Sequence, residues 1–230
     1  MKTALVTGAS KGLGAELASL LARDGYRVIV TARGEQALNA VAEPLGAVAI
    51  AGDVSEADHR RRLIDAAGDR LHLLVNNASD LGPSPMPALA DYPIERLEAV
   101  LRTNVVAPIA LVQEALPLLR RSGGVVVNVT SDAAVGAYEG WGGYGASKAA
   151  IELASATLAR ELKSDGVAVV AVDPGNMRTE MHQAAFPGED ISDRPTPDVT
   201  IPFWVWLLGQ DPASISGSRF EAQGETWTVR

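Results

Sequence analysis

The sequence contains no cysteine and only three histidines, which stand at positions 59, 72 and 182. Without thiols, neither disulfide bonds nor thiolate metal sites can form, and nothing indicates an oxidising compartment. Three scattered histidines also lack the spacing of a zinc or iron site. We therefore expect no metal in this protein.

Basic residues and long apolar runs are also scarce. The 20 Lys and Arg residues face 28 Asp and Glu residues, and the formal net charge of −8 makes nucleic acid an unfavourable partner. The N-terminus lacks the charged and apolar regions of a signal peptide, and no apolar stretch reaches the length that crosses a membrane. We expect a soluble, cytoplasmic protein.

What the chain does contain is a regular alternation of short apolar runs and longer helix-like segments. Hydrophobic residues make up 47% of the sequence and no linker divides it, so we expect a single domain over residues 1–230. Strands without clear polar alternation, joined by helices, indicate a parallel sheet covered on both faces, and right-handed crossovers make it a doubly wound α/β fold. The predicted strands lie near residues 3–7, 27–31, 47–51, 71–75, 125–130, 167–172 and 218–222, and the predicted helices near 14–23, 35–42, 56–67, 93–120 and 144–163.

A glycine-rich turn follows the first predicted strand. Gly8, Gly12 and Gly14 stand just before a predicted helix, where glycines let the backbone bend tightly and approach a phosphate closely. The free N–H groups and the dipole of the helix N-terminus favour an anion at that position. A glycine cluster can also be a simple turn, but its place after the first strand of a βαβ unit favours dinucleotide binding.

The end of the second predicted strand bears on which dinucleotide binds. An NAD site usually has an acidic residue there to hold the ribose 2′-hydroxyl, whereas this chain has Ala32 followed by Arg33. Lys11 lies within the glycine turn, and two cations without a carboxylate suit the additional 2′-phosphate of NADP. Arg33 as a solvated loop residue is the alternative, and Glu35 nearby argues for NAD(H). We expect NADP(H).

A tyrosine and a lysine stand four residues apart, as Tyr144 and Lys148, in a segment expected to be helical, so both side chains should project from one face. A free tyrosine has a pKa of about 10. An ammonium ~5 Å away should lower it by about two units, which would let the phenol exchange a proton with a substrate oxygen. Ser131, thirteen residues upstream, follows a predicted strand. The alternative to a catalytic role for Tyr144 and Lys148 is an ordinary amphipathic contact between them.

These motifs belong to an ordered set that runs from about residue 3 to residue 222. The set consists of T-G-A-S-K-G-L-G at 7–14, Asp53-Val54, N-N-A at 76–78, Asn104, Ser131, Tyr144-x-x-x-Lys148, and Asp173-Pro174-Gly175 followed by Thr179. It resembles the short-chain dehydrogenase/reductase superfamily, in its compact single-domain branch. The resemblance implies a Rossmann-type, three-layer α/β/α fold with seven strands in the order 3-2-1-4-5-6-7. One departure is Ser79, because the family usually reads N-N-A-G there.

The resemblance also implies roles for individual residues. Tyr144 would be the general acid/base, Lys148 would lower its pKa and bind the nicotinamide ribose, Ser131 would hold the substrate oxygen, and Asn104 would support a water in a proton relay. The implied cofactor contacts are Gly8, Ser10, Lys11, Gly12, Leu13, Gly14, Arg33, Asp53, Val54, Asn77, Ala78, Tyr144, Lys148, Pro174, Gly175 and Thr179.

Substrate choice should depend on the polar, Pro- and Gly-interrupted segment at 180–195, which is long enough to act as a lid. Trp141, Met181, His182 and Phe186 are the candidate pocket residues, with ordinary loop packing as the alternative. We expect an NADPH-dependent carbonyl reductase or alcohol dehydrogenase that forms a homodimer or homotetramer. The alternatives are a dinucleotide-binding regulator without turnover and an epimerase or dehydratase.

Overall fold

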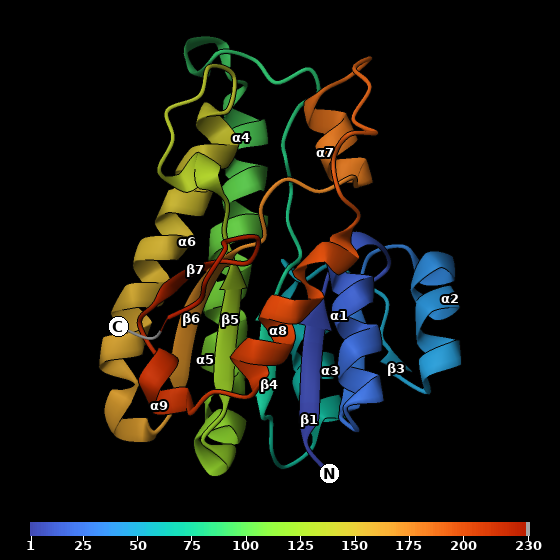
Figure 1. The fold of residues 1–230 in the computed structure, drawn as a ribbon, viewed down its shortest axis with the longest axis vertical. Coiled ribbons are helices and arrows are strands. Elements are labelled where there is room, and N and C mark those ends of the chain that lie inside the picture. The colour runs from blue at the N-terminus through green and yellow to red at the C-terminus, as the bar shows by residue number, and fades with distance from the viewer. Residues whose placement is uncertain (229–230) are drawn as a thin grey trace.

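Seven parallel strands form one twisted sheet in the computed structural model, which describes residues 1–228 (Figure 1). The last two residues of the predicted domain, 229–230, lie outside the described residues. The strands are β1 (Thr3–Thr7), β2 (Arg27–Thr31), β3 (Val48–Ala49), β4 (Leu73–Asn76), β5 (Val125–Val129), β6 (Ala168–Asp173) and β7 (Arg219–Glu221). Their order in the sheet, β3-β2-β1-β4-β5-β6-β7, confirms the predicted topology.

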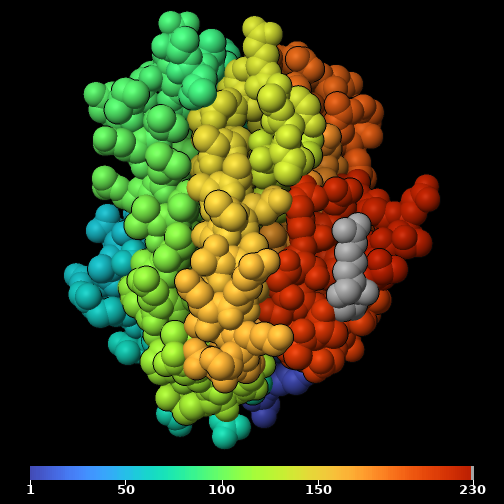
Figure 2. Space-filling model, turned by 90° about the vertical axis from the view of Figure 1, so that its left-hand side faces the viewer, coloured from blue at the N-terminus to red at the C-terminus, as the bar shows by residue number. Residues whose placement is uncertain are grey.

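Helices cover both faces of the sheet. They are α1 (Gly12–Arg23), α2 (Glu35–Leu45), α3 (Ala57–Ala67), α4 (Ile94–Leu101), α5 (Ala107–Ser122), α6 (Gly142–Glu161), α7 (Glu180–Ala185), α8 (Ile201–Leu208) and α9 (Pro212–Ile215). Buried residues of α1, α2 and α8 form one core, and those of α3, α5 and α6 form the core of the opposite face. The predicted three-layer α/β/α architecture is therefore confirmed, and Figure 2 shows α6 beside the α4–α5 run on the surface of the second face.

The strands lack polar alternation because both of their faces are buried. In β1, Ala4 and Val6 contribute to the core under α1, whereas Leu5 between them contributes to the opposite core. All three side chains have 0% exposure. Successive strand side chains point to opposite faces, so a sheet covered on both sides needs apolar residues at every position.

The helix predicted near 93–120 is interrupted. A π-helical turn, Arg102–Val106, separates α4 from α5 and contains the buried Asn104. A π-turn inserts one additional residue into the helical ladder, and such turns are frequent at functional sites. The interruption aims Asn104 toward the loop after β4, where its side chain binds the backbone of Asp80.

We expected no apolar stretch long enough to cross a membrane, and that expectation is wrong. By length and composition alone, the 29 residues of the run Ile94–Ser122 are long and apolar enough to do so. In the structure, Leu111 and Leu119 of this run are 1% and 0% exposed and pack in the core against the sheet. A core helix of a soluble protein passes the same test, and the sheet covers the apolar side chains of α5 that face it, although Ile94 and Val106 remain exposed.

The order of the strands reverses between β1 and β4, and ligands of open α/β sheets bind beyond the carboxyl ends of the strands at such a point. The loops after β1, β2, β4, β5 and β6 all leave the sheet at this edge. Figure 1 shows α7 beyond the same edge, separated from the body of the sheet.

Replacing a central core side chain should cost stability. Leu111→Ala should lower the free energy of unfolding by about 2 to 5 kcal/mol, because the substitution loses buried apolar surface and leaves a cavity. Val135→Ala is the control, since Val135 is 72% exposed and should change that free energy by less than about 0.5 kcal/mol. Urea denaturation followed by circular dichroism measures both, and equal effects would contradict the assignment of Leu111 to the core.

Candidate active site

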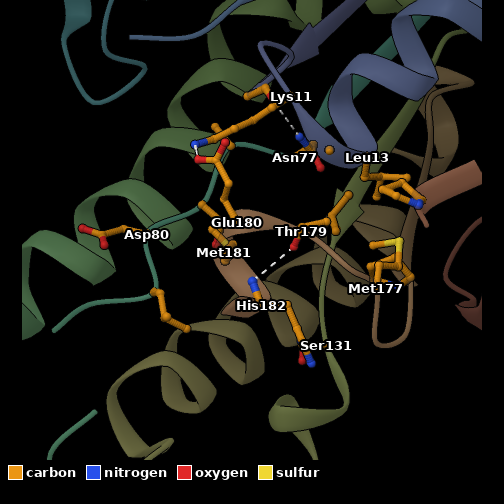
Figure 3. A pocket seen from close by; sticks show the side chains of 18 of the residues that line it. Lys11, Leu13, Asn77, Asp80, Ser131, Met177, Thr179, Glu180, Met181 and His182 are labelled. Carbon is orange, nitrogen blue, oxygen red and sulfur yellow. Dashed lines mark hydrogen bonds and ion pairs between the residues drawn. The ribbon is translucent and has the colours of Figure 1, made fainter. Parts of the chain in front are cut away.

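A cavity of about 840 Å³ lies along the carboxyl edge of the sheet. It extends from the end of β2 past the glycine turn to the start of α6, and α7 contributes to its rim (Figure 3). Every predicted cofactor residue except Gly14 lines it, as do Ser131, Trp141, Met181 and His182. The structure therefore brings together residues that are up to about 170 positions apart in the sequence.

The three positions of the turn require glycine for different structural reasons. Gly8 and Gly12 have φ values of 66° and 57°, which side-chain-bearing residues rarely adopt. Gly14 instead lies beneath the turn, where a Cβ would come within 2.4 Å of the carbonyl oxygen of Gly8. No side chain among residues 1–228 caps the first turn of α1, so its N–H groups are available to a ligand in the cavity.

Asn77 fixes the glycine turn from the neighbouring strand. Its Nδ2 donates to the carbonyl oxygens of Thr7 at 2.9 Å and Gly8 at 3.1 Å. Its backbone N–H donates to the Thr7 hydroxyl at 3.0 Å. The resemblance placed Asn77 along the cofactor, and the structure shows that its amide also joins the end of β4 to the end of β1.

The two predicted phosphate-binding cations have different environments. Arg33 is exposed at the end of the cavity, and its charge helps to lower the pKa of Asp53. Burial raises that pKa, but hydrogen bonds from Ser55, whose N–H donates to Asp53 Oδ1 at 2.8 Å, and the charges of Arg33 and His59 together outweigh it. Lys11 forms an ion pair with Glu180 at the start of α7, so its side chain reaches across the cavity to α7 (Figure 3).

Tyr144 and Lys148 lie on the first turns of α6 and are 8% and 3% exposed. The Lys148 Nζ lies 5.4 Å from the centre of the Tyr144 ring and donates to the carbonyl oxygen of Val129 at 2.9 Å. Ser131 follows β5, and its hydroxyl donates to Asp132 Oδ1 at 2.9 Å. The ring of Trp141 meets Tyr144 edge-on, with the ring centres 5.8 Å apart.

We predicted that Lys148 lowers the pKa of Tyr144. This prediction is wrong, because the protein's own groups together raise that pKa. Burial raises the pKa of Tyr144 above its usual value, and the hydroxyls of Ser79 and Ser131 oppose that effect only in part. Burial also lowers the pKa of Lys148 to about 8, so the ammonium is itself close to losing its proton. The spacing of the pair is visible in the sequence but its burial is not, and burial disfavours the charged form of both groups.

Asp173, at the end of β6, is 5% exposed and counteracts the effect of burial on Lys148, because its negative charge raises the lysine pKa. The carboxylate accepts from the Gly175 N–H at 2.9 Å and pairs with Arg219 at 3.1 Å. Arg219 also lies 3.1 Å from Glu152 on α6. The sequence placed Asp173 in a motif but assigned it no role, and nothing in the sequence indicated Arg219.

Asn104 is 2% exposed and lies behind the cavity wall. Its Oδ1 accepts from the Ser79 hydroxyl at 3.2 Å and from the Asp80 N–H at 2.7 Å. Its Nδ2 donates to the Asp80 carbonyl at 2.8 Å and to the Ser147 hydroxyl at 2.9 Å. An asparagine side chain can make four hydrogen bonds, so these four protein partners occupy it completely, and a relay water would need the backbone of Asn104.

The candidate substrate residues surround the mouth of the site. Trp141, Met181 and His182 line the cavity, whereas Phe186 packs behind them, with ring centres 5.9 Å from Trp141 and 5.0 Å from His182. The His182 Nε2 is buried without a hydrogen-bond partner among the described residues. Thr179 has a function that the resemblance did not indicate, since its hydroxyl caps α7 by accepting from the His182 N–H at 3.1 Å.

Removing the Asp173 charge should lower the pKa of Lys148 further below about 8, because that charge is what opposes burial. Lys148 in Asp173→Asn should then be less charged at neutral pH than in the wild type. Heteronuclear NMR of the lysine side chains measures the midpoint, with Lys148→Met for assignment. Asp69→Asn, an exposed carboxylate, should leave the midpoint unchanged; an unchanged or raised midpoint in Asp173→Asn would contradict the prediction.

Comparisons with known proteins agree with this geometry. A family model described as short chain dehydrogenase matches residues 2–190. The rhamnolipid-biosynthesis 3-oxoacyl-(acyl-carrier-protein) reductase of Pseudomonas aeruginosa is 38% identical over 230 residues, covering 94% of this chain and 87% of that protein. The serine 3-dehydrogenase of Agrobacterium fabrum is 34% identical over 184 residues, covering 77% of this chain and 73% of that protein.

A solved structure extends the likeness to three dimensions. The crystal structure of a short-chain dehydrogenase from Shigella flexneri 2a in complex with NADP matches with a TM-score of 0.89 and 32% sequence identity, covering 97% of each chain. The ordered motifs, the sheet topology and these relatives together show that the chain is an oxidoreductase of the short-chain dehydrogenase/reductase superfamily.

Proposed function

We propose that the protein is an NADP(H)-dependent carbonyl reductase or alcohol dehydrogenase that acts on a small or medium-sized ketone, aldehyde or alcohol. The observation that carries the proposal is one cavity with a cation at one end and Ser131, Tyr144 and Lys148 at the other. The NADP in the related Shigella flexneri structure supports the choice of dinucleotide.

The residues of the cavity fit a dinucleotide in three places. The uncapped N-terminus of α1 would hold the pyrophosphate, and Arg33 would hold a 2′-phosphate by paired hydrogen bonds. Asp53 and Val54 would contact the adenine, and Pro174, Gly175 and Thr179 would flank the nicotinamide. When bound, the reduced nicotinamide supplies the hydride, which no amino-acid side chain can supply.

The protein's own contribution is to hold the substrate oxygen and to move a proton. Ser131 would hold the oxygen by hydrogen bonding, and Tyr144 would give its phenolic proton to that oxygen in reduction and take it back in oxidation. Lys148 would stabilise the phenolate by its charge, which Asp173 helps to maintain. The apolar surfaces of Trp141 and Met181 would exclude water from the reacting carbon.

A homodimer or homotetramer is part of the same proposal. Exposed apolar side chains on α4, the π-helical turn and α6 support it, since Ile94, Val106 and Leu153 are 62%, 58% and 72% exposed. These elements share the surface shown in Figure 2, and apolar side chains gathered on one face favour contact with another subunit.

Turnover is tested with a panel of carbonyl substrates, followed by the loss of NADPH absorbance. Tyr144→Phe should lower kcat/KM by about 10²- to 10⁴-fold, the usual contribution of a general acid, and should leave the NADPH dissociation constant nearly unchanged. Tyr26→Phe removes a phenol far from the cavity and should behave as the wild type. Wild-type turnover in Tyr144→Phe would contradict the mechanism, and NADPH binding without turnover on any substrate would favour a regulatory protein.

Cofactor preference tests the role of Arg33. NADPH should bind the wild type more tightly than NADH, and Arg33→Ala should weaken NADPH binding by about 10- to 100-fold, because charge-assisted hydrogen bonds to the 2′-phosphate are lost. NADH lacks that phosphate, so its affinity should change by less than about twofold and serves as the internal control. Fluorescence titration measures both; an equal effect on the two cofactors would contradict this role.

A further inference from the structure

The C-terminal segment that follows β7 contacts the loop after β6, which carries the proposed nicotinamide contacts. Pro174, Gly175 and Asn176 of this loop line the cavity. The side-chain amide of Gln223 lies against the loop, and its Nε2 donates to the carbonyl oxygens of Pro174 and Asn176, both at 3.0 Å. A side-chain amide nitrogen carries two protons, so one glutamine can bind both carbonyls and span the glycine between them.

The glycine that the amide spans makes the loop turn tightly. Gly175 has a φ of 74°, and a Cβ at this position would come within 2.7 Å of Gln223 Nε2. The Gly175 N–H donates to Asp173 Oδ1 at 2.9 Å. A glycine can adopt many backbone conformations, so the partners on its two sides decide which conformation the loop keeps. Asp173 supplies one of these partners, and Gln223 supplies the others.

The register between β6 and β7 places Gln223 beside this loop. Glu221 is opposite Asp173 in the parallel pair, and the Ala222 N–H donates to the Asp173 carbonyl at 2.8 Å. Arg219 pairs with the carboxylate of the same aspartate at 3.1 Å. The pairing of the two strands therefore ends where the loop begins, and the next residue of the C-terminal segment is Gln223.

The chain beyond Gln223 is anchored as well. The Gly224 N–H donates to the Glu221 carbonyl at 3.0 Å, which turns the chain back on itself. The Trp227 Nε1 donates to the same carbonyl at 3.2 Å, and its ring meets that of Phe203 edge-on, with the ring centres 5.4 Å apart. The backbone of Gln223 is therefore held from both sides, which fixes the position from which its amide reaches the loop.

We propose that Gln223 is a positioning residue, which holds residues 174–176 in the conformation that receives the nicotinamide half of the dinucleotide. The proposal rests on the proposed placement of the nicotinamide against Pro174, Gly175 and Thr179. Gln223 acts on the reaction only through the two carbonyls that it binds, and no proton or electron moves at its amide. A loop fixed before the ligand arrives binds more tightly, because the ligand does not have to order it.

Two ligands that differ in the nicotinamide test this role by isothermal titration calorimetry. Adenosine 2′,5′-bisphosphate carries the adenosine and the 2′-phosphate of NADPH but no nicotinamide. Gln223→Met keeps the length of the side chain without its donors, and should weaken NADPH binding about tenfold because two hydrogen bonds to the loop are lost. Binding of the bisphosphate should change by less than about twofold, since its site does not include this loop. Unchanged NADPH binding, or equal weakening of both ligands, would overturn the proposal.

Two further variants separate this role from a general structural one. Gln223→Lys supplies ammonium donors to the same carbonyls, and should return NADPH affinity to within about threefold of the wild type. Gln210→Met is the matched control, because the Gln210 amide also donates to a backbone carbonyl, that of Trp206 at 2.9 Å, but at the end of α8. It should change the binding of neither ligand. NADPH binding that stays weak in Gln223→Lys would overturn the proposal.

A measurement without turnover distinguishes failure of this inference from failure of the proposed function. Hydrogen exchange of the backbone amides of residues 175–179, in the protein without dinucleotide, should be faster in Gln223→Met than in the wild type and unchanged in Gln210→Met. Unchanged exchange in Gln223→Met would overturn the proposal even in an active enzyme. Faster exchange with selective loss of NADPH affinity, but no turnover on any substrate, would establish the role of Gln223 and reject the proposed reaction.

Discussion

Burial of Tyr144 and Lys148 at the start of α6 is the constraint on which the rest of the site depends. Burial raises the pKa of the phenol and lowers that of the ammonium to about 8, so it opposes the charged form of both. The surrounding groups act against this cost: the hydroxyls of Ser79 and Ser131 lower the tyrosine pKa, and Asp173 raises the lysine pKa. A buried site of this kind makes electrostatic interactions strong, but it also requires that each charged form has a partner.

Asp173 shows the compromise in this arrangement. Its charge helps to keep Lys148 protonated, but the same charge raises the pKa of Tyr144. Arg219 pairs with Asp173 and also with Glu152, which lies on α6 one turn beyond Lys148. The last strand of the sheet thereby links the β6 loop to α6, although among residues 1–228 none of those that line the cavity belongs to β7.

The fold was predictable because its signals are local. Apolar runs in β1 and β2 marked strands to the residue, and the glycine turn marked the start of α1 to within two residues. The long helix near 93–120 was less accurate, since a π-helical turn divides it. Asn104 is a slightly poor helix former and indicated a local distortion there, but an asparagine does not specify a π-turn. The segment at 180–195 stays a predicted lid, and its first part forms the short helix α7. Neither the π-helical turn nor α7 has a specific local signal in the sequence, because packing against another segment decides the backbone conformation at both places.

The sequence by itself determined the family, the order of the strands and the identity of the residues at the carboxyl edge of the sheet, because motif spacing and hydrophobic pattern are properties of the chain. Only the tertiary structure decided the electrostatic state of those residues. Burial, the pairing of Lys11 with Glu180, and the hydrogen bond from Ser79 to Asn104 all depend on segments distant in sequence. The pKa of a side chain is set by the groups and the solvent around it in space, and spacing along the chain does not contain that information.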